Sequence, residues 1–364
     1  MRAYLVLYIL MTILLLADSL LQSKNCRYAL DLFFGLVILF FVGLRVRVGG
    51  DWDSYIRIFN SYITDSAATN FEPAFEFILQ IMTYFDHSVS YQIFNVYYIG
   101  LFLFFLYCFV YNLETVKISV VQISWCVFPI FIFLLTTGYI RQAVASVFIL
   151  PIFCQSHRGK YIRALLWVFV AAIFHKSALG LFLLPGLYFL YGRILFFKAM
   201  IARQKIIVAI LLLVLCLIIV CLFSVYMHLI LSYTDGQLVS KGLAIRMGYF
   251  LILVSPVLWL RRSTFFSLNR RYLLLIMLVL LFFTALCYNY STLVDRYLLY
   301  FYLPAAVLTI KSLSPYNKAN KALVLYYCGM LVVNIVYTFF WLKYSYYGNT
   351  KWIPFCHSVL GCYK

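Results

Sequence analysis

Five short stretches of the sequence place charged or polar side chains at the edges of long apolar runs. They are VRVGGDWDSY (46–55), TTGYIRQAVA (136–145), AAIFHKSAL (171–179), GLAIRMGYF (242–250) and STLVDRYLLYFYLP (291–304). Four of the five contribute an arginine, namely Arg47, Arg141, Arg246 and Arg296. A guanidinium is a rigid fork of N–H donors that suits phosphate oxygens. These stretches therefore predict a site for an anionic substrate.

The same stretches hold two candidates for a general base. Asp51 follows Gly49 and Gly50, which permit a tight turn and the close approach of a ligand. Its carboxylate can accept a proton or orient an arginine. His175 stands beside Lys176 within an apolar segment, and an imidazole titrates near neutral pH. The sequence leaves the choice between Asp51 and His175 open.

Each stretch also has a purely structural explanation. Arginines at helix ends can extend their charged groups to the membrane interface, and Arg141 can pair with an acid of an outer loop. His175 can be a hydrogen-bonded packing residue. Asp295, at the start of a helix, can complement the helix dipole. Four helices that each bring one arginine near one histidine and one acid-rich loop nevertheless favour a functional site.

The composition of the chain is that of a membrane protein. Of its 364 residues 66% are hydrophobic, and the mean hydropathy is +0.98, too apolar for a soluble domain. We expect an all-α, polytopic integral membrane protein with a single transmembrane domain over 1–364 and about twelve transmembrane or re-entrant helices. The expected segments lie near 4–21, 29–45, 92–112, 117–136, 139–154, 163–175, 178–191, 205–231, 243–260, 272–290, 294–311 and 322–342.

Basic clusters give the expected orientation in the membrane. The net charge is +18, and four basic segments without an acid lie at 157–163, 192–205, 261–271 and 311–321. Because Lys and Arg gather on cytoplasmic loops, we expect these segments to face the cytoplasm. No soluble basic domain remains to bind nucleic acid. Alternation then places the long connection 46–91 and the C-terminal tail on the outer face.

The outer face collects acids together with a few arginines. Six of the eleven acidic residues lie within 46–91. The four arginines of these stretches are expected on the same side, against the general bias, and ionisable residues that break such a rule often mark function. An outward cavity lined by guanidiniums, in a chain without a nucleotide-binding loop, indicates a lipid-linked phosphate or diphosphate as the substrate.

Segment 163–191 is expected to be a re-entrant hairpin that turns at His175. A single long helix would put the basic clusters on its two sides at opposite faces of the membrane. Each arm of a hairpin has about 13 residues, roughly 20 Å, which is shorter than an apolar core of about 30 Å. The turn should therefore lie below the outer surface, in a cavity lined by protein or water.

The cysteines give little chemistry. Most of the ten lie in apolar runs, where a buried thiol is inert. Cys356 and Cys362 lie in the polar tail and can pair if that tail is outside the cytoplasm. The spacing of cysteines and histidines predicts no metal site. The first apolar run lacks a small-residue cleavage site, so we expect it to stay as a helix.

Five short motifs, in order along the chain, resemble those of the EpsG/Wzy-type polysaccharide polymerases, which include bacterial O-antigen polymerases. The matching motifs are Arg47 through Asp51, Trp52 and Tyr55; Glu72-Pro73 with Phe75; Ile140-Arg141-Gln142 with Ala145; Phe174-His175-Lys176-Ser177-Ala178; and Arg296-Tyr297 with Tyr300-Phe301. Two positions depart from the family pattern: Gly50 stands where threonine is common, and Trp52 where tyrosine is common.

The resemblance implies a multi-pass enzyme of the bacterial inner membrane, similar in fold to lipid-dependent, GT-C-like glycosyltransferases, with 46–91 in the periplasm. Such an enzyme transfers a growing glycan from undecaprenyl diphosphate to the sugar of an incoming lipid-linked repeat unit. It needs no nucleotide sugar, and we expect no cofactor. A chain-length regulator is a further expected partner.

The resemblance and the residue chemistry together assign the site. The expected catalytic residues are Asp51, His175 and Arg141. The expected substrate-binding residues are Arg47, Tyr55, Arg246, Arg296 and Tyr297. The arginines would bind diphosphate, and the tyrosines would hold sugar rings.

Three other functions use similar chemistry. An O-antigen ligase would be expected to carry its long outer loop late in the chain, whereas here that loop is 46–91. A flippase or transporter of lipid-linked sugars should show inverted repeats, and none is visible. A membrane acyltransferase with His175 as its base is a further alternative.

Overall fold

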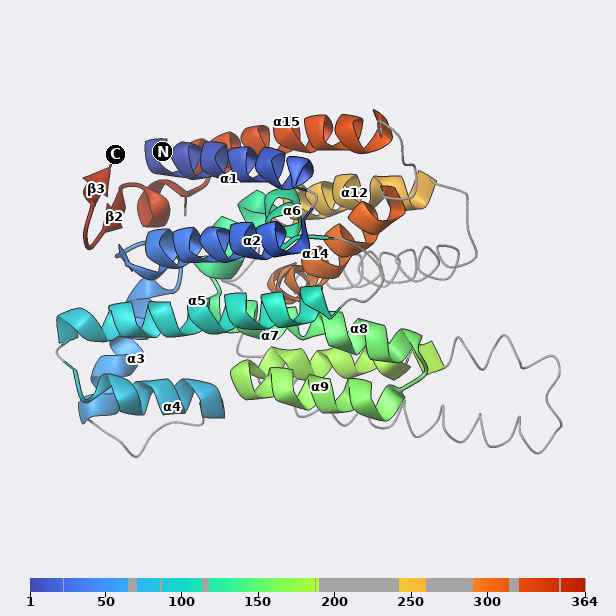
Figure 1. The fold of residues 1–364 in the computed structure, drawn as a ribbon. Helices are drawn as coiled ribbons and strands as arrows, with labels where there is room; N and C mark the ends of the chain where they lie inside the picture. The colour runs from blue at the N-terminus through green and yellow to red at the C-terminus, as the bar shows by residue number, and fades with distance from the viewer. Residues whose placement is uncertain are drawn as a thin grey trace, which may run out of the picture.

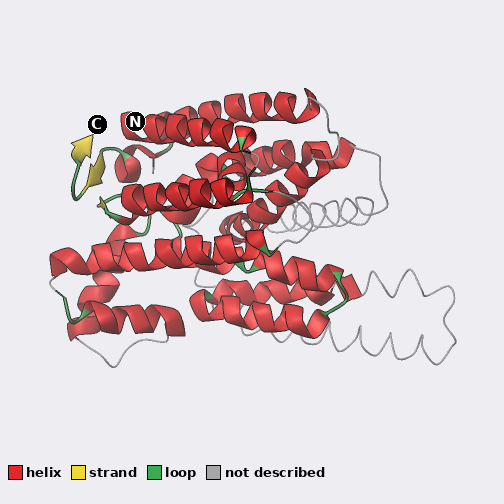
Figure 2. Cartoon of the chain, viewed as in Figure 1, coloured by secondary structure: helices red, strands yellow, loops and turns green. Residues whose placement is uncertain are grey.

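Helices make up most of the described chain, as the computed structural model in Figure 2 shows. The structure describes residues 1–21, 23–64, 71–85, 87–112, 118–186, 188–189, 242–259, 291–313, 321–346 and 348–363. Two expected segments, 205–231 and 272–290, and the basic clusters 192–205 and 261–271 lie outside these residues.

The described part of the chain contains long apolar α-helices and several shorter helices between them. The α-helices are α1 (Arg2–Leu20), α2 (Lys24–Ile38), α3 (Trp52–Thr64), α4 (Pro73–Met82), α5 (His87–Tyr111), α6 (Val120–Cys126), α7 (Ile140–Val147), α8 (Ile149–His157), α9 (Tyr161–Phe174), α12 (Leu243–Trp259), α14 (Ser291–Leu313) and α15 (Lys321–Tyr344). Shorter π and 3-10 helices are η1 (Leu39–Gly43), η2 (Ile130–Thr136), η3 (Lys176–Phe182) and η6 (Gly348–Trp352).

Four described helices are long and apolar enough to cross a membrane. They are Arg2–Leu20, Lys24–Gly43, Val89–Tyr111 and Leu323–Tyr344. A fifth candidate is the pair Ile130–Thr136 and Ile140–His157, which is bent by 111°. The structure thus confirms an all-α membrane protein, whereas the count of about twelve helices stays a prediction. Expected segment 117–136 is not one continuous helix, because α6 ends at Cys126 and η2 begins at Ile130.

The two ends of the helix bundle differ in what they carry. The N-terminus, α3, α4 and the C-terminal strands lie at one end, on the left of Figure 1. The connections from α1 to α2 and from α8 to α9 lie at the opposite end. Basic residues lie in or directly beside these two connections, whereas the basic clusters 192–205 and 261–271 lie outside the described residues. Which end faces the cytoplasm stays a prediction.

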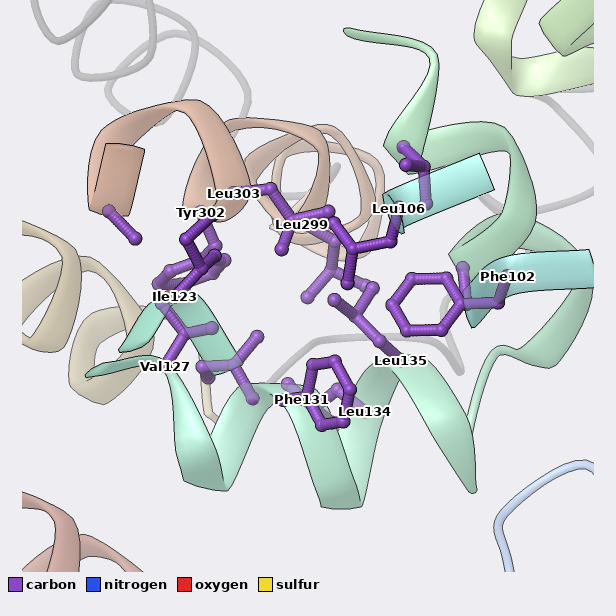
Figure 3. Close-up of a cluster of buried hydrophobic side chains, with 14 of the residues drawn as sticks. Phe102, Leu106, Ile123, Val127, Phe131, Leu134, Leu135, Leu299, Tyr302 and Leu303 are labelled. Carbon is purple, nitrogen blue, oxygen red and sulfur yellow. The ribbon is translucent and has the colours of Figure 1, made fainter. Parts of the chain in front are cut away.

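The core of the bundle joins helices from the two halves of the chain. Figure 3 shows buried side chains of α5, α6, η2 and α14 packed together. The labelled residues are Phe102, Leu106, Ile123, Val127, Phe131, Leu134, Leu135, Leu299, Tyr302 and Leu303. All are buried hydrophobic residues, so the segment between α6 and α7 is held from both sides.

Between α6 and η2 the helix is interrupted, and side chains of distant helices form hydrogen bonds with the carbonyl groups there. Tyr249 of α12 donates its hydroxyl hydrogen bond to the carbonyl of Cys126 at 2.7 Å. The amide of Asn334 in α15 donates to the carbonyl of Trp125 at 2.9 Å. A helix that breaks inside an apolar core needs such partners for its freed carbonyl groups.

Two buried carboxylates hold the other end of α6. Asp31 accepts hydrogen bonds from the backbone N–H groups of Val120 and Val121, at 3.2 and 3.0 Å. Asp18 accepts from the side-chain amide of Gln122 at 2.7 Å. Both acids therefore fix the start of α6 against α1 and α2, which is a structural task.

The expected hairpin around His175 is present. The chain leaves the helical conformation at His175, between α9 and η3. The rings of Tyr161 and Phe189, which lie on opposite sides of the turn, are 5.5 Å apart. The two arms therefore lie side by side, and the turn is held inside the bundle by its neighbours.

The C-terminal tail forms a small antiparallel sheet with the segment after η1. Strand β1 (Arg45–Val46) pairs with β2 (Phe355–His357), which pairs with β3 (Gly361–Tyr363). Cys356 and Cys362 face each other in this sheet and form a disulfide, the pairing considered possible from the sequence. The tail is thereby fixed beside the turn that leads to α3.

Candidate functional site

Glu72 joins Arg141 to His175, two residues that lie on other segments of the chain. Its Oε2 lies 2.8 Å from Nη1 of Arg141, and its Oε1 lies 3.1 Å from Nδ1 of His175. The backbone N–H of Lys176 also donates to Oε1, at 3.2 Å. Glu72 itself is only 5% exposed. We call Glu72, Arg141 and His175 the Glu72 cluster.

Three helix boundaries create this cluster. Glu72 precedes Pro73, the first residue of α4, where proline is favoured because its missing N–H is not needed. Arg141 is the second residue of α7, after the bend at 136–138. His175 is the turn of the hairpin. Each side chain therefore stands where its backbone changes direction, which lets three distant segments converge on one point.

The carboxyl group of Glu72 is ionised. Burial alone would raise its pKa, but the hydrogen bond from His175 and the charge of Arg141 outweigh burial and lower the pKa to about 2. A carboxylate can only accept hydrogen bonds, so Nδ1 of His175 is the donor between them. In the neutral ring the lone pair then lies on Nε2, which is the nitrogen able to accept a proton.

The guanidinium of Arg141 packs over two aromatic rings. Its Cζ lies 4.3 Å from the centre of the Phe75 ring and 5.5 Å from that of Tyr55. Cations are attracted to such ring faces. Burial raises the pKa of Tyr55 to about 12, so its ring stays a neutral phenol. The expected site residues Tyr55 and Arg141 thus meet in the structure.

Asp51 lies in the electric field of two expected site arginines. Burial raises the pKa of its carboxyl, and the charges of Arg296 and Arg141 act in the opposite direction. Asp51 comes directly before α3 and so is held at the start of a helix. Asp51, Arg141 and Arg296 therefore lie in one neighbourhood, and the roles expected for them stay predictions.

Arg296 reaches this neighbourhood from α14. Its Cζ lies 5.4 Å from the centre of the Tyr139 ring, next to the start of α7. The side-chain amide of Gln142 donates to the backbone carbonyl of Arg296 at 2.5 Å. The starts of α7 and α14 are therefore fastened to each other, which sets the separation of Arg141 and Arg296.

Arg246 is held by a carboxylate. Its Nε and Nη2 donate to the two oxygens of Asp295, the second bond at 2.5 Å, so the pair is bidentate. Both residues are buried, and the pair joins α12 to α14. Tyr302 donates to the backbone carbonyl of Arg246 at 2.8 Å. The substrate-binding role expected for Arg246 stays a prediction, beside this structural pairing.

Arg47 of the first stretch and its neighbour Arg45 have different surroundings. Arg45 is buried and donates to the carbonyls of Val42 and Val48, at 2.7 and 3.0 Å, so it shapes its own loop. Arg47 is exposed and has a φ of 56°. Among the contacts of the described residues, none joins Arg47 to the Glu72 cluster. Its proposed contact with phosphate stays a prediction.

Residues of α14 also support the hairpin. The hydroxyl groups of Ser177 and Tyr300 lie 2.8 Å apart. A Cβ built on Gly180 would lie 2.1 Å from the hydroxyl oxygen of Tyr297, so α14 approaches the hairpin closely there. Tyr297 thus packs against the second arm of the hairpin. Its proposed contact with a sugar ring stays a prediction.

Glu72 is the residue that the assignment of site residues missed. The sequence showed it as one acid among six in 46–91 and as part of a family motif. The available signal was its place directly before a proline at the start of a helix. Its partners lie 69 and 103 residues further along the chain, so spacing alone did not reveal them. Within the described residues, no three His, Cys, Asp or Glu side chains group to hold a metal ion.

Comparison with known proteins gives one finding. The model of the family described as "EpsG family" matches residues 28–357, a range that contains every candidate site residue. No curated protein and no solved structure matches the chain significantly. The expected likeness to GT-C-like glycosyltransferases therefore stays a prediction.

Proposed function

The chain belongs to the EpsG family, and on that premise we propose that it is a polysaccharide polymerase. The proposed substrates are undecaprenyl-diphosphate-linked oligosaccharide repeat units, joined at the periplasmic face of the bacterial inner membrane. The observation that carries the proposal is the Glu72 cluster, which places a histidine with a defined donor nitrogen beside an arginine. The charge of Arg141 acts on Asp51, and the charge of Arg296 acts on His175.

Arg141 and Arg296 are the groups proposed to bind the diphosphate of the growing chain. As the bond from the anomeric carbon to the diphosphate oxygen breaks, that oxygen gains negative charge. Guanidiniums fixed in advance stabilise this developing charge more than the ground state. Arg141 is fixed by Glu72 and Phe75, and Arg296 by its place over Tyr139. Arg47 and Arg246 remain proposed contacts of the lipid-linked substrates.

His175 is the proposed general base. The acceptor hydroxyl oxygen attacks the anomeric carbon of the growing chain and forms the new glycosidic bond, while its proton passes to Nε2 of His175. The polyprenyl diphosphate leaves with the electrons of the broken carbon–oxygen bond. Glu72 accepts from Nδ1 and so stabilises the imidazolium that forms.

Asp51 is the alternative base. Because two arginines act on its carboxylate, it equally suits the orientation of those guanidiniums. The two roles differ in their test. Removing a base is expected to lower the rate by about 10²–10⁴-fold, mainly in kcat. Removing an arginine-orienting group should raise KM for the lipid-linked substrate as well. His175→Gln and Asp51→Asn therefore separate the roles in one assay.

The function itself is tested by the lipopolysaccharide bands of a deletion strain. A strain left with one repeat unit on its core has lost a polymerase, which supports the proposal. Complete loss of O-antigen would instead indicate a ligase or flippase, and complete ladders with altered serology an acyltransferase. Complementation should restore ladders with the wild-type chain and with His157→Gln, at the opposite end of the bundle, but not with His175→Gln.

A further inference from the structure

The C-terminal tail lies over the turn that carries Asp51. We call residues 348–363 the C-terminal strap. The backbone N–H of Gly49 donates to the carbonyl of Lys351 at 2.9 Å. A Cβ built on Gly50 would lie 3.1 Å from the ring of Trp352. At the exposed rim, Lys351 and Asp53 form an ion pair at 2.5 Å. The strap therefore covers a turn that lies about 300 residues earlier in the chain.

Trp352 also contacts the segment that leads to Arg141. Its ring N–H donates to the hydroxyl oxygen of Thr137 at 2.7 Å, and that hydroxyl lies 2.7 Å from the carbonyl of Ile132, to which it donates. Trp352 is only 3% exposed, so this hydrogen bond is shielded from water. One buried indole is thus bound to the turn that precedes α7.

The two turns bridged by Trp352 are in direct contact with each other. A Cβ built on Gly49 would lie 2.1 Å from the carbonyl oxygen of Thr137, and the φ of Gly49 is +118°. Only glycine tolerates that conformation and that approach. Asp51 follows Gly49 by two residues, and Arg141 follows Thr137 by four. Their relative position is therefore set where Gly49, Thr137 and Trp352 meet.

The strap is itself anchored on several sides. The β1–β2 pairing ties it to Arg45–Val46, and the Cys356–Cys362 disulfide closes its hairpin. The hydroxyl of Tyr4 in α1 donates to the carbonyl of Trp352 at 3.1 Å. The disulfide and the hydrogen bonds of the sheet fix the strap, so the buried N–H of Trp352 is suited to hold the Thr137 turn in place.

We propose that Trp352 is a positioning residue of the transfer reaction, which docks the Asp51 turn against the Thr137 turn so that Asp51 and Arg141 face one substrate. This inference rests on the proposed polymerase function. Trp352 acts through the two turns and does not touch the substrate. A misplacement of reacting groups by about 1 Å can cost about 10²-fold in rate, so a modest shift of one turn is sufficient to be measured.

The test uses variants that remove one partner of the hydrogen bond between Trp352 and Thr137 at a time. Trp352→Phe removes the donor, Thr137→Ala removes the acceptor, and Thr137→Ser keeps a hydroxyl. We expect the first two to lower kcat at least tenfold with KM close to wild type. Thr137→Ser should be close to wild type. The double variant should be no slower than the slower single variant, because both changes break one interaction.

A matched control is Trp341→Phe. Trp341 packs edge-to-face on Trp352, with ring centres 4.7 Å apart, but makes no described hydrogen bond to either turn. It should leave kcat unchanged. Wild-type kcat in Trp352→Phe and Thr137→Ala would overturn the positioning role, and so would a loss confined to KM or to protein level.

A second readout does not depend on activity. In the variant Asp53→Cys/Lys351→Cys, a short bismaleimide should cross-link the strap to the Asp51 turn, as detected by peptide mass spectrometry. Adding Trp352→Phe should lower the yield. If that dependence appears but the parent chain never polymerises, the docking stands and the proposed function fails. If the parent polymerises and Trp352→Phe changes neither yield nor kcat, the docking fails alone.

The disulfide gives a reversible form of the test. Dithiothreitol supplies two electrons and ends as its cyclic disulfide, while Cys356 and Cys362 become thiols. The other described cysteines are already free. Purified enzyme in vesicles should slow several-fold on reduction and recover with oxidised glutathione. The variant Cys356→Ser/Cys362→Ser should not respond to either reagent. Equal rates before and after reduction would contradict a role for the strap.

Discussion

Glu72 and His175 lie 103 residues apart in the chain, yet Oε1 of the first and Nδ1 of the second are separated by 3.1 Å. The other oxygen of the same carboxylate binds Arg141 at 2.8 Å. One side chain therefore sets the tautomer of the proposed base and the position of the proposed diphosphate clamp. Changes at Glu72 should affect both tasks together.

Glu72→Gln should lower polymerisation by about 10²-fold or more. The amide NH₂ can donate to Nδ1 of His175, which selects the tautomer with its proton on Nε2 and removes the base. The free energy of unfolding should fall by about 1–3 kcal/mol, because hydrogen bonds to two cationic or polar partners are weakened. Polymer length on gels and the thermal midpoint in detergent measure the two effects.

Glu76→Gln is the matched control for this change. Glu76 lies one turn further along α4 and is half-buried. The same chemical change there should leave the polymer and the thermal midpoint unaltered. Equal losses in both variants would mean that the effect comes from α4 as a whole and not from the Glu72 cluster.

Arg141→Lys should abolish full-length polymer at normal protein level. Lysine keeps the charge but loses the planar fork and the stacking of that fork on Phe75, where Cζ now lies 4.3 Å from the ring centre. The loss of one such stabilising donor set is expected to cost about 10²–10³-fold in kcat. Arg57→Lys, at an exposed arginine that donates to Ser54, should have no effect. Full-length polymer from Arg141→Lys would refute the clamp.

The stability of the protein should depend on acid pH through Glu72. Its pKa is about 2 in the folded chain, below the ordinary value of 4.5. A carboxyl whose pKa is lowered by folding contributes stability above its unfolded pKa and loses it as pH falls through the folded pKa. The difference in thermal midpoint between wild type and Glu72→Gln should therefore be constant near neutrality. It should shrink as the pH is lowered from 4.5 towards 2. A difference that stays constant over this range would contradict the ionised pair.

Asp295→Asn should destabilise the pairing of α12 with α14. Arg246 would keep its burial but lose the carboxylate that binds two of its nitrogens. Removing one partner of a buried ion pair costs about 3–5 kcal/mol. Asp53→Asn is the control, since its pair with Lys351 is largely exposed and worth at most about 1 kcal/mol. If the two variants unfold alike in detergent, the buried pair is not what joins the helices.

The apolar segments and the turn at His175 were predictable because they depend on local composition and on the charge bias of loops. Several of the long apolar runs are helices in the structure, and the basic clusters on both sides of 163–191 predicted the hairpin that the structure contains. The break between α6 and η2 was not predictable in this way. It depends on Asn334 and Tyr249, which lie far away in the chain.

The candidate site was predictable only in part, for the same physical reason. Asp51, Arg141 and Arg296 stood out because isolated charges at the edge of an apolar run are costly. Glu72 lies in a polar connection, where an acid is unremarkable, and only the fold reveals its two partners. Arg45 and Arg47 look equivalent in the sequence, yet one is buried in its own loop and the other is exposed.

The hydrogen bonds that Asn334 and Tyr249 make at the α6 break have a consequence for genetics. These side chains, together with the carbonyls of Trp125 and Cys126, hold a helix break on which the position of η2 and the Thr137 turn depends. Random mutagenesis that selects for loss of the polymer should therefore recover substitutions at Asn334 and Tyr249 as well as at Arg141. A map of such alleles would mark the inner scaffold and the reacting groups alike.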